Sequence, residues 1–208
     1  LEGLALGVGD KQTITVFQFV YFFSRNGVPS SNIMHVAVLD PNVNIEGDEG
    51  IGGFCGTLVD SRIISCFATG TVYANSDYIG GFCGYNDGGT VTYCYSTAEV
   101  YSDYGYAGGF VGYNEGTINY CYATGDVESD DDYAGGFVGY NDDDGEINNC
   151  YATGDVYTDY DYAGGFVGYN EGDINRCYST GEPEAYNNFE GGFSGYNDGY
   201  FTCCFWNE

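Results

Sequence analysis

Carboxylates are the side chains of this sequence that could do chemistry, and several recur at fixed spacing. The chain carries 31 acidic residues against 4 basic ones, a formal net charge of −27. Asp103, Asp130 and Asp159 occupy one position of a repeat, and Asp132 and Asp161 occupy another. Carboxylate oxygens bind calcium readily, so these five aspartates predict calcium sites on a repeated surface. The alternative is a solvated acidic face that keeps the protein soluble.

Catalysis is not expected from these residues. General acid or base chemistry needs one carboxylate singled out by its environment, whereas these acids recur from unit to unit. His35 is the only histidine, so a histidine metal site or a catalytic triad would lack members. We therefore expect a protein that is not an enzyme and that has no cofactor, with calcium as the one exception.

The composition also limits partners and location. Nucleic acids and anionic membranes need clustered Lys and Arg, which are absent here. The longest apolar run, residues 14–23, contains Thr15 and Gln18 and is shorter than the roughly 20 residues that span a bilayer. No signal peptide is recognisable at Leu1, so we expect a processed, mature chain. Nine cysteines with few basic residues favour a secreted, extracellular or cell-surface protein.

The element that positions the carboxylates is a repeat of about 28 residues, with the phrase YAGGFVGYN at 106–114, 133–141 and 162–170. From each repeated cysteine to the next phenylalanine is always 16 residues, as from Cys66 to Phe82. The gap from phenylalanine to cysteine varies, and all of the variation lies in the Asn/Asp/Gly-rich segment after GYN. Asn, Asp and Gly tolerate left-handed backbone angles, so this segment is a turn that accepts insertions.

A fixed unit of this size predicts a solenoid, because one unit cannot bury its own apolar face. Within it the sequence indicates three short strands, GGFVGYN, TINYCYAT and DVYTDYDY, separated by turns. Three strands per coil, stacked about 4.8 Å apart, make an all-β β-solenoid (β-helix) of five to six coils over 51–208. Residues 1–50 do not fit the period and form an N-terminal two-strand segment. The handedness is left open.

Stacking turns each repeat position into a column of like residues. Two columns form the predicted core ladder: Phe54, Phe82, Phe110, Phe137, Phe166, Phe193 and Cys66, Cys94, Cys121, Cys150, Cys177, Cys204. Cys55 and Cys83 also share a column on adjacent coils, at a Cα separation within the disulfide range, and are the disulfide candidates. Buried free thiols are the alternative for all of these cysteines.

Tyrosines form two further columns: Tyr85, Tyr113, Tyr140, Tyr169, Tyr196 and Tyr95, Tyr122, Tyr151, Tyr178. Exposed aromatic rows either bind sugars or another chain, or stabilise a sheet through cross-strand contacts. The acidic columns carry a separate expectation. Neighbouring like charges should raise folded-state carboxylate pKa values above their unfolded values.

The units resemble the GLUG repeat in the pattern GGFVGYN…G.IN.CYATGDV, with Phe in place of the usual Leu. Residues 107–128 and 134–156 match most closely, and the resemblance covers about 51–208. GLUG repeats occur in large bacterial and archaeal surface proteins, including adhesins and some secreted peptidases. The resemblance implies a β-solenoid displayed on a surface, and it implies no catalytic residue.

The two ends of the chain suggest how it assembles. The N-terminal strands are either a cap over the first coil or strands that pair with a neighbour. Trp206, the only tryptophan, replaces the small Ala/Ser column of earlier units, where it either plugs its own coil or anchors a neighbour. The predicted subunit interface comprises Ile14, Val16, Phe17, Phe19, Val20, Phe22 and Trp206.

The sequence-based function is a structural subunit of an extracellular filament or surface fibre, a homopolymer that assembles head-to-tail through its solenoid ends and N-terminal strands. The alternative is a monomeric adhesin or glycan-binding module of a larger cell-surface protein, whose partners would be a host surface or glycans.

Overall fold

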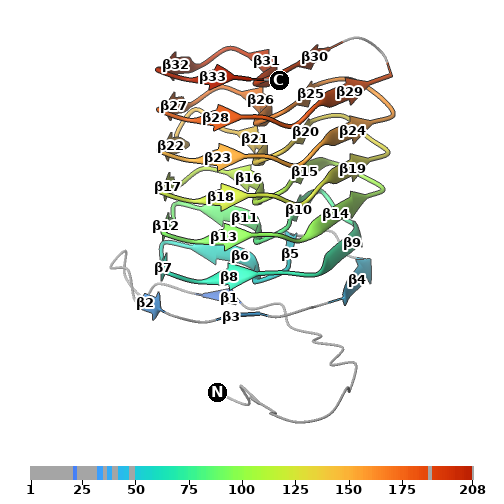
Figure 1. Ribbon diagram of the computed structural model, residues 1–208. Coiled ribbons are helices and arrows are strands. Elements are labelled where there is room, and N and C mark those ends of the chain that lie inside the picture. Colours follow the sequence, from blue (N-terminus) through green and yellow to red (C-terminus); the bar gives the residue numbers. More distant parts are fainter. Residues whose placement is uncertain are drawn as a thin grey trace.

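The computed structural model describes residues 21–22, 32–34, 37–38, 42–46, 50–186 and 189–207. In that part of the chain it contains only short strands and no helix, and the strands stack in parallel into a β-solenoid of about six turns (Figure 1). Each coil visits five parallel sheets, numbered here 1 to 5 in that order. The predicted all-β solenoid is confirmed, but a coil has five strands where the sequence indicated three.

Sheet 1 contains the GYN segments. Its strands are β1 (Tyr21–Phe22), β6 (Cys55–Val59), β11 (Cys83–Asp87), β16 (Val111–Asn114), β21 (Val138–Asn141), β26 (Val167–Asn170) and β31 (Ser194–Asn197). The register places like opposite like, with Tyr113 opposite Tyr140 and Asn114 opposite Asn141. The predicted turn follows each GYN strand from β11 to β31; in the longest copy, the amide of Gly145 donates to the Asp142 carbonyl at 2.8 Å.

Sheets 2 and 3 divide the predicted TINYCYAT strand. Sheet 2 is β2 (Asn32–Met34), β7 (Arg62–Ile64), β12 (Thr90–Thr92), β17 (Thr117–Asn119), β22 (Glu146–Asn148), β27 (Asp173–Asn175) and β32 (Tyr200–Thr202). Sheet 3 is β3 (Ala37–Val38), β8 (Phe67–Ala68), β13 (Tyr95–Ser96), β18 (Tyr122–Ala123), β23 (Tyr151–Ala152), β28 (Tyr178–Ser179) and β33 (Phe205–Trp206). A left-handed residue makes the corner between them, such as Tyr120 at φ 54°. The corner turns both Ile118 and Cys121 inward.

Sheets 4 and 5 complete the coil. Sheet 4 is β4 (Asn42–Glu46), β9 (Thr71–Asn75), β14 (Glu99–Ser102), β19 (Val127–Ser129), β24 (Val156–Thr158) and β29 (Pro183–Ala185). Sheet 5 is β5 (Ile51–Gly52), β10 (Tyr78–Gly80), β15 (Tyr106–Gly108), β20 (Ala134–Gly135), β25 (Ala163–Gly164) and β30 (Glu190–Gly191). The first glycine of the Gly-Gly pair lies where two backbone segments approach closely: a Cβ on Gly135 would lie 2.0 Å from the Val138 carbonyl oxygen.

The core consists of ladders. The phenylalanine rings stack from coil to coil with centroids 4.7–4.9 Å apart, and the four middle rings are fully buried. The cysteine column from Cys66 to Cys177 is buried beside them, whereas Phe54, Phe193 and Cys204 at the ends are partly buried. The members of both predicted columns thus lie in the core or pack against it. A second cluster, between sheets 4 and 5, contains valines and alanines such as Val127 and Ala134.

The described strands of the N-terminal segment pair with the first coil of the repeats. Strands β1 to β4 each pair in parallel with the next coil, with Tyr21 opposite Thr57, Ile33 opposite Ile63 and Val43 opposite Val72. They continue sheets 1 to 4 by one more coil, at the blue end of Figure 1. The reason is that backbone pairing needs a matching strand edge, not a matching repeat sequence.

Candidate functional site

The predicted acidic columns are real alignments. The amide of Asp130 donates to the Ser102 carbonyl at 2.8 Å, and that of Asp159 to the Ser129 carbonyl at 3.0 Å. The residue that follows each sheet 4 strand is therefore stacked coil upon coil. The hydroxyl of Tyr157 donates to Oδ1 of Asp159 at 2.7 Å and that of Tyr73 to Oδ1 of Asp103 at 2.8 Å, so two carboxylates of this column already have protein partners.

The second acidic column lies between sheets 4 and 5. Oδ1 of Asp132 accepts the amide of Asp161 at 3.0 Å. Burial, and then the charges of Asp131 and Asp161, raise the pKa of Asp132. In the described residues, no three His, Cys, Asp or Glu side chains lie close enough to hold a metal ion. The carboxylates of successive coils lie in a line along the stack and do not converge on one point. The predicted calcium sites therefore have no preformed group of ligands in this part of the chain.

The cysteine column is a chain of hydrogen-bonded thiols. The amide of Cys94 donates to Sγ of Cys121 at 3.3 Å, and that of Cys121 to Sγ of Cys150 at 3.3 Å. Each thiol donates in turn to a carbonyl two residues earlier; for Cys121 this is Asn119, at 3.2 Å. Burial raises the pKa of the Cys121 thiol, whereas hydrogen bonds with the neighbouring thiols lower the pKa of Cys94 to about 4. Because all the thiols from Cys66 to Cys177 are buried in the core cluster, the column contributes to core packing.

The predicted Cys55–Cys83 disulfide is absent from the structure, and both residues are buried free thiols. They do lie opposite each other in the β6–β11 register. Side chains in an in-register parallel ladder point the same way, so the two Cβ atoms stay about one strand spacing apart, longer than a disulfide prefers. The Cys83 thiol instead donates to the Tyr85 carbonyl at 3.3 Å.

Within each of the two predicted tyrosine columns, the rings stack face to face. Tyr95 and Tyr122 stack with centroids 4.8 Å apart and an interplanar angle of 2°, and Tyr113 and Tyr140 stack at 5.0 Å and 1°. Burial, followed by hydrogen bonding to Asp142, raises the pKa of Tyr113. Because the faces are occupied, these columns stabilise the sheets and offer only ring edges to a sugar.

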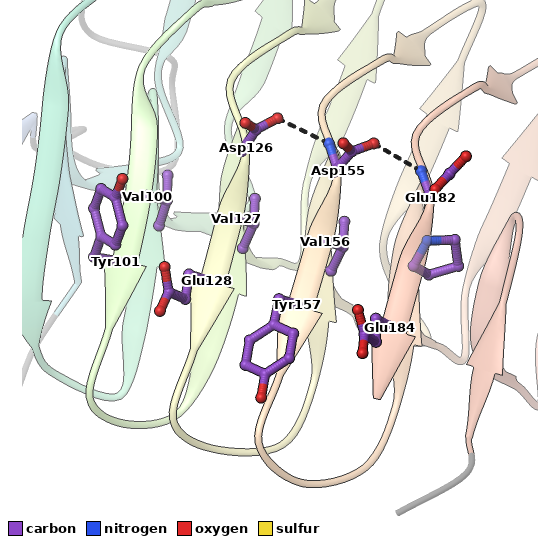
Figure 2. Close-up of a pocket in the computed structure, with 11 residues that line it drawn as sticks. Val100, Tyr101, Asp126, Val127, Glu128, Asp155, Val156, Tyr157, Glu182 and Glu184 are labelled. Carbon is purple, nitrogen blue, oxygen red and sulfur yellow. Dashed lines mark hydrogen bonds between the residues drawn. The ribbon is translucent and has the colours of Figure 1, made fainter. Parts of the chain in front are cut away.

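A groove of about 410 Å³ crosses the outer face of sheet 4 over β14, β19, β24 and β29 (Figure 2). One wall consists of Asp126, Asp155 and Glu182. The other contains Tyr101, Glu128, Tyr157 and Glu184. The residues of the two walls, such as Asp126 and Glu128, are two positions apart in each coil and both face outward. The valines between them point into the core.

Carboxylates along the first groove wall are held in place by the coil above. Oδ1 of Asp126 accepts the Asp155 amide at 2.9 Å, and Oδ1 of Asp155 accepts the Glu182 amide at 2.9 Å. The dashed lines in Figure 2 follow this row. Sequence reasoning missed the groove, because alternate residues of DVYTDYDY were not assigned to faces.

Trp206 lies over its own coil. Its Nε1 donates to the Gly181 carbonyl at 3.1 Å, and its ring fills the space beside Gly192, where a Cβ would lie 2.0 Å from an indole carbon. The side chain is 38% exposed. Of the two readings of Trp206, these contacts favour a plug of its own coil, with one surface left open.

Of the other predicted interface residues, the structure describes Phe22. Phe22 is in β1, opposite Leu58. The other five, Ile14, Val16, Phe17, Phe19 and Val20, lie outside the described residues, as does His35. No helix in the described part of the chain is long and apolar enough to cross a membrane.

Comparison with known proteins identifies one similarity. The chain matches the sequence model of the GLUG motif at residues 47–73, 75–101, 103–128, 132–157 and 159–182, which together make up more than half of its length. The final unit, from 183 onward, is not part of the match. No curated protein matches the chain, and no solved structure matches it.

Proposed function

The chain belongs to the GLUG-motif family, and from this premise we propose that it is a structural subunit of an extracellular filament or surface fibre, assembling head-to-tail with copies of itself. A GLUG-repeat β-solenoid is a repeat-based surface or structural module. Solenoids of this kind extend by adding strands to an open edge, and a heterologous end-to-end contact that fails to close gives an open fibre.

The end face of the last described coil carries this proposal. Phe201, Phe205 and Trp206 are 37%, 58% and 38% exposed. One coil earlier, the columns of Phe201 and Trp206 hold Ile174 and Ser179, which are fully buried, and the column of Phe205 holds the half-buried Tyr178. Positions that are buried inside the stack are thus exposed to solvent at this end face and carry large apolar side chains. Exposed apolar surface of that kind marks an interface.

The opposite face offers a matching edge. Strands β2, β3 and β4 end their sheets, and within the described residues no strand pairs with their outer edges. Unpaired parallel edges are templates for another strand. Adding the β31–β33 end of one copy to the β1–β4 end of the next would continue sheets 1 to 3 without a change of pairing type.

Negative-stain electron microscopy of the purified chain tests the proposal. Unbranched filaments are expected from the wild type and from Tyr93→Asp, an equally exposed position on the side of the stack (59%). Phe205→Asp should abolish them by placing a charge on the end face. Uniform monomers at high concentration, unchanged by Phe205→Asp or by deletion of residues 1–25, would contradict assembly.

The second candidate is a monomeric adhesin or glycan-binding module of a larger cell-surface protein. The groove on sheet 4 favours it, because it lies on the side of the stack and would stay open in a monomer and in a filament.

A further inference from the structure

The two tyrosines of the groove, Tyr101 and Tyr157, differ from the tyrosines of the stacked columns in their ring contacts. Tyr101 and Tyr157 make no ring contact with another aromatic side chain in the described part of the chain, although both lie in one column of sheet 4. Glu128 occupies the coil between them. Their ring faces are therefore not consumed by a ladder and remain available to a ligand in the groove.

Each groove ring is held by its hydroxyl group. The hydroxyl of Tyr101 donates to Oε2 of Glu99 at 3.2 Å, and that of Tyr157 donates to Oδ1 of Asp159 at 2.7 Å. Tyr73, one coil below Tyr101, bonds Oδ1 of Asp103 instead, at 2.8 Å. The two neighbouring rings bend toward different carboxylates, which explains why this column does not stack. A ring that is already oriented loses less freedom when it binds.

The geometry points to a binding site for a linear glycan that carries no acidic groups. Two coils separate Tyr101 from Tyr157, so their Cα atoms lie roughly 10 Å apart along the stack, at two strand spacings. An extended glycan presents alternate sugar rings in the same orientation, so it can place one ring face on each tyrosine. The groove runs along the stack, as such a chain would.

The carboxylates supply the polar contacts of this site. Asp126 and Asp155 each use one oxygen on a backbone amide, which fixes the side chain and leaves the second oxygen to accept a sugar hydroxyl. Glu128 and Glu184 face them from the other wall. With five carboxylates and no basic residue in the lining, uronic, sialic or sulfated sugars are repelled, and neutral or amine-bearing sugars are accepted.

This inference rests on the second candidate function and not on filament assembly. Isothermal titration calorimetry of the full chain would use cellohexaose as the neutral glycan and hexaglucosamine as the amine-bearing one. Binding of either supports the site, and the tighter of the two identifies its source. Tyr101→Ala and Tyr157→Ala should each weaken binding about tenfold. Tyr104→Ala, at a 58% exposed tyrosine outside the lining, is the matched control and should bind like the wild type.

The glycan site would be overturned by no binding of either hexasaccharide, by equal binding to the Tyr157→Ala and Tyr104→Ala variants, or by equally tight binding of oligogalacturonate. Oligolysine that binds more tightly than both glycans would show a simple cation surface and would also overturn it. Filament formation is followed on the same variants. Because the groove variants leave the end face intact, their filaments should persist, so the two proposals fail separately.

Discussion

Asn86 donates from Nδ2 to Oδ1 of Asn114 at 2.7 Å, the first bond of a buried amide ladder. The ladder continues with bonds of 2.8 Å through Asn141, Asn170 and Asn197. Each inner amide also donates to a carbonyl of the following turn, such as Gly116 for Asn114. The ladder thus ties the insertion-tolerant turn to the core and keeps the coils in register.

At the Asn86 end of the ladder, we expect a buried aliphatic residue to tolerate replacement by asparagine. Oδ1 of Asn86 is buried without a hydrogen-bond partner in the described residues, and the position one coil below is Leu58. Leu58→Asn would place an amide donor under it. We expect urea denaturation to show a much smaller loss of unfolding free energy for Leu58→Asn than for Ile63→Asn, an equally buried aliphatic position. Equal losses would mean that Asn86 has another partner, such as water.

Cutting the ladder in the middle should be costly. Asn114→Ala removes one of the two acceptors of the Asn86 amide, which keeps only the Gly89 carbonyl, and it leaves Oδ1 of Asn141 without its ladder donor. The loss should be about 3 kcal/mol of unfolding free energy, since buried polar groups without partners are penalised. Asn197→Ala, at the exposed end, removes one ladder bond and should cost less than half as much. Comparable denaturation midpoints for the two variants would contradict a cooperative ladder.

Periodicity accounts for what the sequence predicted well. The 16-residue step from Cys121 to Phe137 leaves no room for insertion, and both residues are buried in the core. The variable turn lies after Asn141, as its Asn, Asp and Gly content indicated. The asparagine of GYN lies in the buried ladder, a role that its recurrence in each GYN could have indicated.

What periodicity could not predict depends on side-chain direction or on non-repeating sequence. Asn32–Met34 shares no repeat letters with Arg62–Ile64 beyond an isoleucine, yet the backbones pair. The groove arises because Glu128 interrupts a tyrosine column, which shows only once the facing of each residue is known. The Cys55–Cys83 pairing failed because Cα distance alone ignores parallel Cβ directions.

The thiols make a direct chemical prediction. Cys203 is exposed, whereas Cys55, Cys83 and the column from Cys66 to Cys177 are buried. Iodoacetamide should modify Cys203 rapidly in the native protein and leave the buried thiols unmodified. In denaturant without reductant, mass spectrometry should then find all nine cysteines alkylated. If Cys55 and Cys83 escaped alkylation until reductant was added, the result would support the disulfide predicted from the sequence.

The acidic column between sheets 4 and 5 predicts a pH dependence. The folded-state pKa of Asp132 is raised, so the folded protein binds this proton more tightly than the unfolded chain does. Its contribution to stability is fully present below the unfolded pKa and is lost as the pH rises through the folded pKa. Asp132→Asn removes that loss and can still accept the Asp161 amide at Oδ1.

Asp132→Asn should therefore melt at a higher temperature than the wild type at pH 7 and low salt. The difference in Tm should shrink as the pH falls through the raised pKa. It should vanish below the unperturbed Asp pKa of about 3.9, where both side chains are neutral. Thermal scans across this range measure it. Asp130→Asn, at an exposed aspartate, controls for the general loss of one negative charge. A Tm gain that is the same at every pH, or the same in both variants, would show that burial of Asp132 is not its cause.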